Sequence, residues 1–297
     1  MIKAFIVYNE YSNSKSTKTK IERLIEEGNK LDIHFDVYTN LDLDFYFKDG
    51  KEYIPTIDNK DYKFCIFLDK DKYLSKAIDR KILMINNFQS IFDCDDKMET
   101  YQKLVSLDIK TPLIVPAPLN YSNKNDEDLK KKFLNKVTSK LNFPIVVKES
   151  FGSLGMQVHL ANNYEELSSY YDKLITKPHF YSEYISYEKG TDYRVITVGK
   201  RVICCMQRHN DNDFRSNIAL GGKGKKYKLP KEVEDMVVKI VSALNLEYSG
   251  VDLIKDSDDQ YKLLEVNSNA FFEGVEAVTK INVTRELLLH ILSLLNR

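Results

Sequence analysis

The sequence predicts an α/β protein with a parallel sheet in its first third, followed by a larger α+β part. Two observations lead to this prediction. Short apolar runs at residues 2–8, 33–38 and 64–68 alternate with segments of helical periodicity, which is the pattern of strands joined by crossover helices. Beyond residue 95, strand-like runs follow one another in pairs across short turns, which is typical of antiparallel hairpins.

Within the first part, the helix is expected at residues 14–31 and a further short strand at 82–86. The dipeptide Asp49-Gly50 marks a tight turn and predicts a hairpin inserted into this part. After residue 95 we expect a helix at about 95–107 and a polar surface loop at 120–128. The remaining expected elements are strands at 144–148, 157–160 and 179–185, a helix at 164–175, a hairpin of 195–198 and 202–206 around Gly199-Lys200, a helix at 230–244, a hairpin of 250–255 and 261–266, and a terminal helix from about Val283.

Composition narrows the class of partner. The 297 residues include 44 basic and 44 acidic side chains, so the formal net charge is zero and we expect no nucleic-acid partner. No apolar run approaches the ~18 residues that a membrane span needs, so we expect no membrane partner. The four cysteines lack the spacing of a zinc or redox site and predict reduced thiols in a cytoplasmic protein. A homo-oligomer is compatible with this composition.

Three oxygen-bearing side chains in the last hairpin predict a metal site. Glu265 and Asn267 are two residues apart and share a strand face, and pairing of the hairpin would bring Asp252 opposite Glu265. Two carboxylates placed opposite each other destabilise a sheet unless a cation compensates them. Carboxylate and amide oxygens suit Mg²⁺. Alternatively, a one-residue change of register would turn both acids toward solvent.

A strand ending at Lys148 and the turn behind it predict a phosphate-binding loop. Gly152 and Gly155 allow backbone amides to approach phosphate oxygens closely, and Lys148 supplies a positive charge. The order of strand, lysine and glycines is neither that of a P-loop nor that of a protein kinase. The alternative is an ordinary hairpin that carries a surface lysine.

A third cluster combines arginines with glycines between residues 192 and 224. Arg194, Arg208 and Arg215 precede a Gly221-Gly222 pair, and arginine forks hold phosphoryl oxygens bidentately. The alternative is a solvated basic loop.

The order of these three clusters resembles the ATP-grasp superfamily, most closely its RimK-like α-L-glutamate ligase branch. The resemblance covers about residue 95 to the C-terminus. The matching motifs are Asp95-Asp96-Lys97, residues 146–155, Glu183-Tyr184-Ile185, residues 213–217 with Gly221-Gly222, Gly250-Val251-Asp252 and Glu265-Val266-Asn267.

The resemblance implies an ATP-grasp fold with a pre-ATP-grasp domain at 1–95, a central lid subdomain at 96–182 and a C-terminal metal-binding subdomain at 183–297. It also implies ATP and Mg²⁺, with Mn²⁺ as an alternative metal. The implied nucleotide contacts are Lys97, Lys148, Gly152, Ser153, Gly155, Glu183, Tyr184, Ile185, Asp192, Arg215, Ser216 and Asn217. The implied catalytic residues are Arg208, Arg215 and Asn217, and the implied metal ligands are Asp252, Glu265 and Asn267.

The function implied by the resemblance is a carboxylate–amine ligase that forms an amide through an acyl phosphate. Its partners would be a small-molecule or peptide carboxylate and an amine, for example glutamate added to a peptide, protein or small acid. Two alternatives are a peptide-modifying ligase that makes side-chain amide or ester crosslinks, and an ATP-binding regulatory protein without turnover. Residues 268–274 replace the Pro-Gly turn of many relatives, so the resemblance does not identify the added amino acid.

Overall fold

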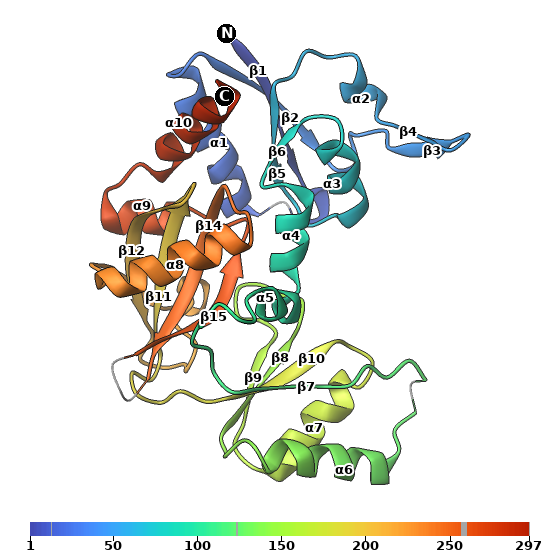
Figure 1. Cartoon of the computed structure of the whole chain (residues 1–297), viewed down its shortest axis with the longest axis vertical. Coiled ribbons are helices and arrows are strands. Elements are labelled where there is room, and N and C mark those ends of the chain that lie inside the picture. The colour runs from blue at the N-terminus through green and yellow to red at the C-terminus, as the bar shows by residue number, and fades with distance from the viewer. Residues whose placement is uncertain (13, 123, 257–259, 297) are drawn as a thin grey trace.

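A computed structural model describes the chain except for residues 13, 123, 257–259 and 297. Its described part contains three main sheets, which Figure 1 shows with the C-terminal sheet between the N-terminal and the central sheet. None of the described helices is long and apolar enough to cross a membrane. The domain boundaries at residues 95 and 182 stay a prediction.

The N-terminal sheet is parallel, as predicted, with the strand order β2-β1-β5-β6. Alternation of buried strands with helices produces this layer because each crossover helix covers a face of the sheet. The predicted hairpin at Asp49-Gly50 is also present. The elements of this part are β1 (Ile2–Tyr8), α1 (Lys15–Asn29), β2 (Ile33–Thr39), β3 (Tyr46–Lys48), β4 (Lys51–Tyr53), α2 (Pro55–Asp58), β5 (Phe64–Leu68), α3 (Lys72–Asp79) and β6 (Leu83–Ile85).

The central sheet is antiparallel, with the order β7-β10-β8-β9. Two helices pack on it through a core that includes Leu134, Val147 and Leu167. The elements are β7 (Ile114–Pro116), α6 (Glu127–Thr138), β8 (Ile145–Glu149), β9 (Val158–Ala161), α7 (Tyr164–Leu174) and β10 (His179–Glu183).

The C-terminal sheet is antiparallel, with the order β13-β12-β11-β14-β15. One face packs against α8 and the other faces α9, α10 and the N-terminal sheet. The adjacent Cys204 and Cys205 belong to the two different cores, so they lie on opposite faces of β12 as the sequence predicts. The elements are β11 (Thr191–Val198), β12 (Arg201–His209), β13 (Lys223–Tyr227), α8 (Lys231–Ala243), β14 (Tyr248–Lys255), β15 (Tyr261–Asn267), α9 (Glu273–Thr279) and α10 (Val283–Leu295).

The helix expected at about 95–107 is shorter, and a second helix precedes it. Helix α5 spans Lys97–Lys103, and α4 (Phe88–Asp95) ends just before it, with Asp96 between the two. Asp96 caps α5 because its side chain accepts a hydrogen bond from the backbone N–H of Met98 at 2.8 Å. The backbone N–H of Lys97 donates to the carbonyl of Ser150 at 3.0 Å, which ties the start of α5 to the turn after β8.

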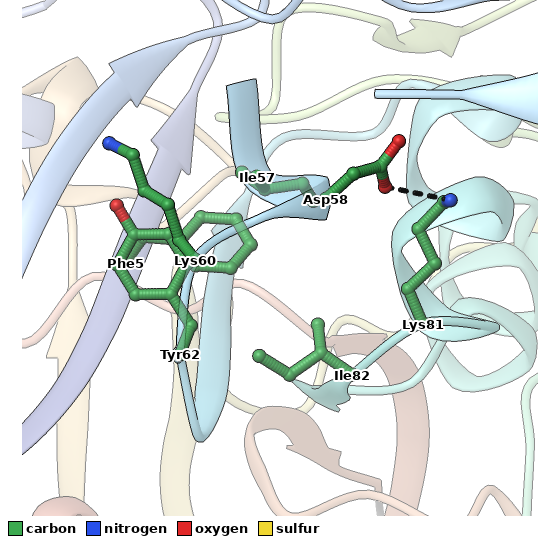
Figure 2. A pocket seen from close by; sticks show the side chains of 7 residues that line it. All are labelled: Phe5, Ile57, Asp58, Lys60, Tyr62, Lys81 and Ile82. Carbon is green, nitrogen blue, oxygen red and sulfur yellow. Dashed lines mark ion pairs between the residues drawn. The ribbon is translucent and has the colours of Figure 1, made fainter. Parts of the chain in front are cut away.

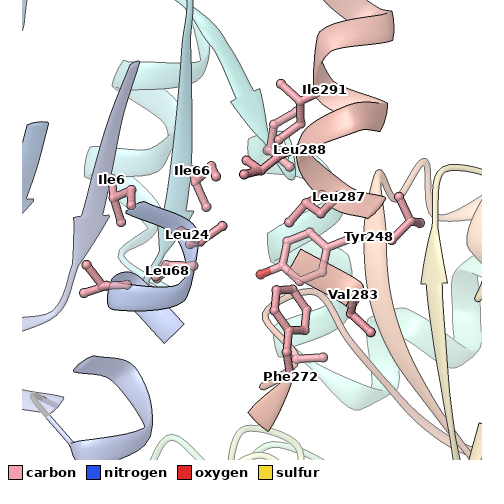
Figure 3. Close-up of a cluster of buried hydrophobic side chains, with 14 of the residues drawn as sticks. Ile6, Leu24, Ile66, Leu68, Tyr248, Phe272, Val283, Leu287, Leu288 and Ile291 are labelled. Atoms are coloured by element: carbon pink, nitrogen blue, oxygen red, sulfur yellow. The ribbon is translucent and has the colours of Figure 1, made fainter. Parts of the chain in front are cut away.

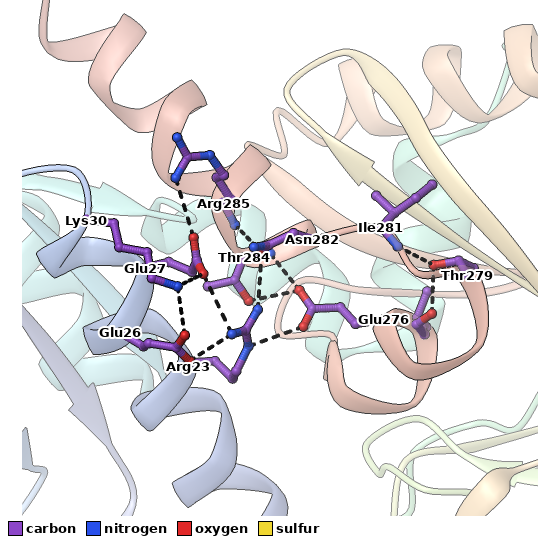
Figure 4. Close-up of polar contacts among 11 residues, drawn as sticks. Arg23, Glu26, Glu27, Lys30, Glu276, Thr279, Ile281, Asn282, Thr284 and Arg285 are labelled. Atoms are coloured by element: carbon purple, nitrogen blue, oxygen red, sulfur yellow. Dashed lines mark hydrogen bonds and ion pairs between the residues drawn. The ribbon is translucent and has the colours of Figure 1, made fainter.

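The N-terminal and C-terminal sheets share one hydrophobic core. Figure 3 shows Ile6 and Leu24 on one side of this core and Tyr248, Phe272 and Leu287 on the other. Helix α1 also makes a polar contact cluster with α9 and α10, in which Arg23 lies 3.4 Å from Glu276 (Figure 4). The apolar core that the two sheets share makes the main contribution to holding these layers together.

Replacing Asn86 by alanine is expected to destabilise the fold by about 2–4 kcal/mol, because buried backbone groups lose their partners. The Asn86 amide donates to the carbonyls of Tyr248 at 2.8 Å and Ser268 at 2.7 Å, and its oxygen accepts from Glu247 N–H at 2.6 Å. Urea denaturation measures the loss, with Asn135→Ala on the exposed side of α6 as the control. A loss below ~1 kcal/mol would contradict this role for Asn86.

Candidate active site

A cleft lies between the central and the C-terminal sheet. Strands β8 and β10 line it from one sheet and β11, β12, β14 and β15 from the other. It encloses about 820 Å³ of non-protein space, which includes its open mouth. The predicted site residues that line it are Lys148, Gly155, Glu183, Tyr184, Ile185, Asp192, Arg208, Arg215, Ser216, Asn217, Asp252 and Glu265.

The two acids of the last hairpin pair directly, as predicted: Asp252 on β14 lies opposite Glu265 on β15. The next pair is Leu253 with Leu263, so Leu264 is the extra residue of a β-bulge. Leu263 points into the core beneath the sheet, whereas Leu264 and Glu265 both line the cleft. Without the bulge, strict alternation would place Glu265 on the core face together with Leu263. The bulge therefore brings this acid to the face of Asp252.

Opposite charges alternate across the neighbouring strands. Arg194 on β11 lies opposite Asp252 and donates to both of its carboxylate oxygens, with Nη2 at 2.6 Å from Oδ2. Arg208 on β12 lies opposite Asp192 and donates to both of its oxygens, at 2.6 and 2.5 Å. The Nη2 atom of Arg208 is also 3.1 Å from Asp252. This buried network fixes two guanidinium groups beside the acids.

The pKa directions follow from burial and from these pairs. Burial works to raise the pKa of Asp252, but Arg194 and Arg208 lower it overall, so this group stays a carboxylate at neutral pH. Burial raises the pKa of Asp192, and the contact with Arg208 opposes that effect. Burial works to lower the pKa of Arg208, but Asp252 and Asp192 raise it overall.

Lys97 and Asn267 do not line the cleft but contact Glu265, which does. The ammonium of Lys97 donates to the carbonyl of Gly152 at 3.2 Å and lies 3.9 Å from Glu265 Oε2. The amide nitrogen of Asn267 donates to Glu265 Oε1 at 2.9 Å. Lys97 thus links the glycine turn after β8 to the acids of the C-terminal sheet.

The three predicted metal ligands fit a magnesium ion. Glu265 and Asn267 are in contact, and Glu265 is paired with Asp252, so two carboxylates and an amide come from adjacent strands. A carboxylate has about four lone-pair positions, so Asp252 can bind a cation beside its arginine contacts. Among the described residues, no group of three or more His, Cys, Asp and Glu has metal-binding geometry; here the third donor is an amide.

The glycine turn packs against residues 215–217. Arg215 Nη1 donates to the carbonyl of Gly155 at 2.8 Å, and its other nitrogens bond Asp213. Gly155 has a φ of +75°, and a Cβ there would lie 2.7 Å from Asn217 Oδ1. Ser153 sits in the same turn, where its N–H donates to the side chain of Gln157 at 3.2 Å. The turn can approach Asn217 this closely only because residue 155 is glycine.

Replacing Gly155 by alanine is expected to lower kcat/KM for ATP at least ~tenfold, because the turn must move away from Asn217 to accommodate the added Cβ. Steady-state kinetics with varied ATP measures this effect. Gly50→Ala is the matched control: its φ is +73°, but no atom lies within 4 Å of the added Cβ. Equal kinetic effects of the two substitutions would show that backbone strain, not the contact with Asn217, matters.

The end of β8 places Lys148 in the cleft on the central-sheet side. Burial lowers the pKa of Lys148 to about 8; Glu265 opposes this shift, Lys97 adds to it and Asp252 opposes it. Because burial disfavours the charged form of Lys148, a bound anion in the cleft would stabilise its protonated form.

The two acidic side chains among the predicted nucleotide contacts are engaged by protein partners. The Glu183 carboxylate accepts a hydrogen bond from Lys262 at 2.7 Å. Both oxygens of Asp192 accept from Arg208. Main-chain atoms of residues 183–185 remain candidates for ligand contacts, because this segment lines the cleft.

Several residues that the sequence prediction left without a site role line the cleft, and Val146, Ile254 and Leu264 among them give it an apolar lining. Arg194, which the sequence placed in the arginine cluster, pairs with Asp252. Strand alternation could have found Val146 and Ile254, which lie two residues from Lys148 and Asp252. Leu264 required knowledge of the bulge.

A second pocket lies in the N-terminal part and is lined by Phe5, Ile57, Lys60, Tyr62 and neighbouring residues (Figure 2). Its charged groups are paired: Lys81 lies 2.8 Å from Asp58, and Lys60 donates to Tyr38 at 2.6 Å. None of the predicted site residues lines it.

Comparison with known proteins identifies the family and the fold. The family model of the RimK-like ATP-grasp domain matches residues 94–291. The alpha-aminoadipate–LysW ligase LysX of Saccharolobus solfataricus is 26% identical over 279 residues, which cover 90% of this chain and 94% of LysX.

Two solved structures share the fold. The D-alanine–D-alanine ligase from Bacillus anthracis complexed with ATP has a TM-score of 0.72 and 17% identity, covering 99% of this chain and 97% of the ligase. The ATP-grasp ligase PsnB complexed with a phosphomimetic variant of its minimal precursor, Mg and ADP has a TM-score of 0.69 and 14% identity, covering 100% of both chains. The expected ATP-grasp fold is confirmed, and since the family model covers more than half of the sequence, the chain belongs to the RimK-like ATP-grasp family.

Proposed function

We propose that this protein is an ATP-dependent ligase that joins a carboxylate to an amine and releases ADP and phosphate. The proposal rests on the cleft, whose lining combines Lys148 from one sheet with Asp252, Glu265 and Arg208 from the other. A lysine on one wall, with two acids and a buried arginine on the other, suits a polyphosphate that is bound with a divalent metal. Family membership and the ligase LysX support the same chemistry.

The nucleotide would bind along the cleft. Its base fits the apolar part between Val146 and the pair of Ile254 and Leu264, next to the main chain of residues 183–185. Its phosphates would then lie toward Lys148 and the turn at Gly155. Closure of the turn over the phosphates would exclude water from the transfer.

The chain's own residues would promote reaction by position and charge. The γ-phosphoryl group is transferred to the substrate carboxylate, which gives an acyl phosphate and ADP; the amine then attacks the acyl carbon and expels phosphate. Arg208 and Arg215 would neutralise the charge on the transferred group, and Asn217 would orient it. No protein nucleophile is needed. The buried contacts of Arg208 with Asp192 and Asp252 hold its guanidinium in one orientation.

Asp252, Glu265 and Asn267 would hold magnesium, with manganese as an alternative. A metal at these oxygens would supply charge neutralisation for the terminal phosphates. The donor set supports this assignment, and so does the ATP-grasp neighbour PsnB, which was solved with Mg and ADP.

Affinity for ADP is expected to fall as the pH rises through about 8, the pKa of Lys148. Phosphate binds the protonated lysine, so the affinity is constant below this pH and falls up to ~tenfold per pH unit above it, until the pKa of the phosphate-bound lysine is reached. Calorimetry across this range measures the dependence. In Lys148→Arg, whose guanidinium keeps its charge, the curve should be flat; an unchanged slope in this variant would assign the effect to another group.

The ligase function is tested by ADP release in a matrix of carboxylates and amines. The expected result is release that needs both substrates and yields one amide per ADP, detected by mass spectrometry. Because LysX is a ligase of alpha-aminoadipate and LysW and another ATP-grasp ligase was solved with a leader and core peptide, the matrix should include amino acids and peptide carboxylates. Rings formed within a peptide would instead support the crosslinking alternative. Tight Mg-ATP binding without turnover for any pair would support a regulatory protein.

A further inference from the structure

A buried lysine outside the cleft holds the segment that follows the metal-binding strand. Lys20 on α1 is only 4% exposed. Its ammonium donates to Tyr248 Oη at 2.8 Å, Asn269 Oδ1 at 2.7 Å and the carbonyl of Ala270 at 2.7 Å. An ammonium has three donors, so these contacts use its full capacity. It also lies 4.6 Å from the ring centroid of Phe272.

All of these partners lie next to the proposed metal ligands. Asn269 and Ala270 follow Asn267 by two and three residues. Tyr248 lies on β14 two residues before Gly250, and Gly250 is the residue that pairs with Asn267. A Cβ at Gly250 would lie 2.9 Å from that of Ala270 and 3.1 Å from Arg194. The segment held by Lys20 therefore packs directly against the strand that carries Asp252.

A second residue of the N-terminal part holds the same segment one position earlier. The Asn86 amide donates to the carbonyl of Ser268, the residue between Asn267 and Asn269. Lys20 on α1 and Asn86, just after β6, thus fix three consecutive residues behind Asn267. Burial lowers the pKa of the Lys20 side chain well below its usual value, so an apolar side chain would join these layers at lower cost. What the ammonium adds is a defined direction for each of its three acceptors.

We propose that Lys20 is a positioning residue for the metal site: it fixes residues 268–270 and thereby the placement of Asn267 and Glu265 oxygens toward the divalent cation. The proposal rests on the proposed function only in taking Mg²⁺ to bind together with the nucleotide. It assigns to the N-terminal part a role in the C-terminal metal site that the resemblance does not include. The segment it fixes is also the one in which this sequence departs from the Pro-Gly turn of many relatives.

The test is calorimetric titration of Mg²⁺ into the protein with bound ADP. Lys20→Met, which keeps the length of the side chain and removes its donors, should weaken Mg²⁺ binding at least ~fivefold. Binding of ADP without Mg²⁺ should stay within ~twofold of wild type, which a general loss of structure would not permit. Lys18→Met is the matched control, because Lys18 lies on the same helix with an exposed side chain; it should change neither value.

Asn269→Ala provides a second variant that leaves Lys20 in place, should Lys20→Met fold poorly. It removes one acceptor and should weaken Mg²⁺ binding ~two- to fivefold. Wild-type affinity for Mg²⁺ in Lys20→Met, or in Asn269→Ala when the first variant does not fold, would overturn the proposal. Turnover is measured separately: Mg²⁺ binding without ligation by wild type would reject the ligase function and leave the role of Lys20 standing, whereas ADP binding that is indifferent to Mg²⁺ would reject Lys20 as well.

Discussion

Asp252→Asn is expected to reduce ATP turnover by about 10³-fold or more. The change keeps the shape of the side chain but removes the negative charge that faces Glu265 across the strand pair. Charge neutralisation by a bound metal is worth several kcal/mol in a phosphoryl transfer, and each 1.4 kcal/mol is a factor of ten in rate. Single-turnover measurements of ADP formation at saturating ATP give the size of the effect.

The paired variant Glu265→Gln should show a loss of similar size, because both carboxylates are proposed to hold the same ion. Asp235→Asn, at an exposed position on α8, is the control and should be indistinguishable from wild type. Since Asp252 also neutralises Arg194 and Arg208, its replacement should lower the thermal midpoint as well. Turnover within ~tenfold of wild type in both acid variants would remove the metal assignment.

Arg208→Met is expected to have the largest effect on stability, a loss of about 3–5 kcal/mol. Its side chain is 6% exposed and neutralises two carboxylates that are themselves nearly inaccessible, Asp192 and Asp252. Removing one partner from a buried ion pair leaves an uncompensated charge, which costs far more than the intact pair contributes. Urea denaturation at pH 7 gives the free energy of unfolding.

Two further variants test the cause of that loss. Arg201→Met lies on the same strand, but its side chain is 67% exposed, so it should change stability by less than ~0.5 kcal/mol. Adding Asp192→Asn to Arg208→Met removes one of the stranded charges and should recover part of the loss. A double variant no more stable than Arg208→Met would show that lost packing, not uncompensated charge, is responsible.

The sequence predicted the pairing of the last hairpin because two acids in otherwise apolar strands require a common compensating charge. It could not predict the bulge at Leu264, which depends on how β15 twists against β14. The bulge decides which face receives Glu265, so the alternation argument alone would have left the two acids on different sides. The correct pairing was predicted from charge, and the local geometry that achieves it was not.

The sequence also could not predict which side chains from distant elements pair with the site residues. The resemblance suggests a nucleotide contact for Glu183, yet its carboxylate bonds Lys262, 79 residues away in the sequence. Arg194 was recognised as part of a basic cluster, but its role as the partner of Asp252 follows only from the register of β11 with β14. Long-range pairs of this kind are set by strand order, which local patterns do not encode.

Two lysine-rich segments form a strand and a helix that the sequence did not predict. Strand β13 resembles a basic loop in sequence because four of its five residues are lysine or glycine. It nevertheless pairs with β12 at the edge of the sheet, where lysines are common. Helix α6 begins within the stretch expected as a loop, capped by Asp126, whose side chain accepts from Leu129 N–H at 3.0 Å. Its lysines lie around the apolar positions Leu134 and Val137, which face the core.

The central claim is that Asp252, Glu265 and Asn267 hold a divalent ion at the terminal phosphates of ATP, beneath the turn that follows Lys148. A crystal structure with Mg²⁺ and a non-hydrolysable ATP analogue tests it most directly. The expected result is a metal with ~2.0–2.1 Å bonds to oxygens of these side chains and of the phosphates, and the Lys148 ammonium within hydrogen-bonding distance of a phosphate. Phosphates bound away from Lys148, or a metal that contacts neither Asp252 nor Glu265, would contradict the claim.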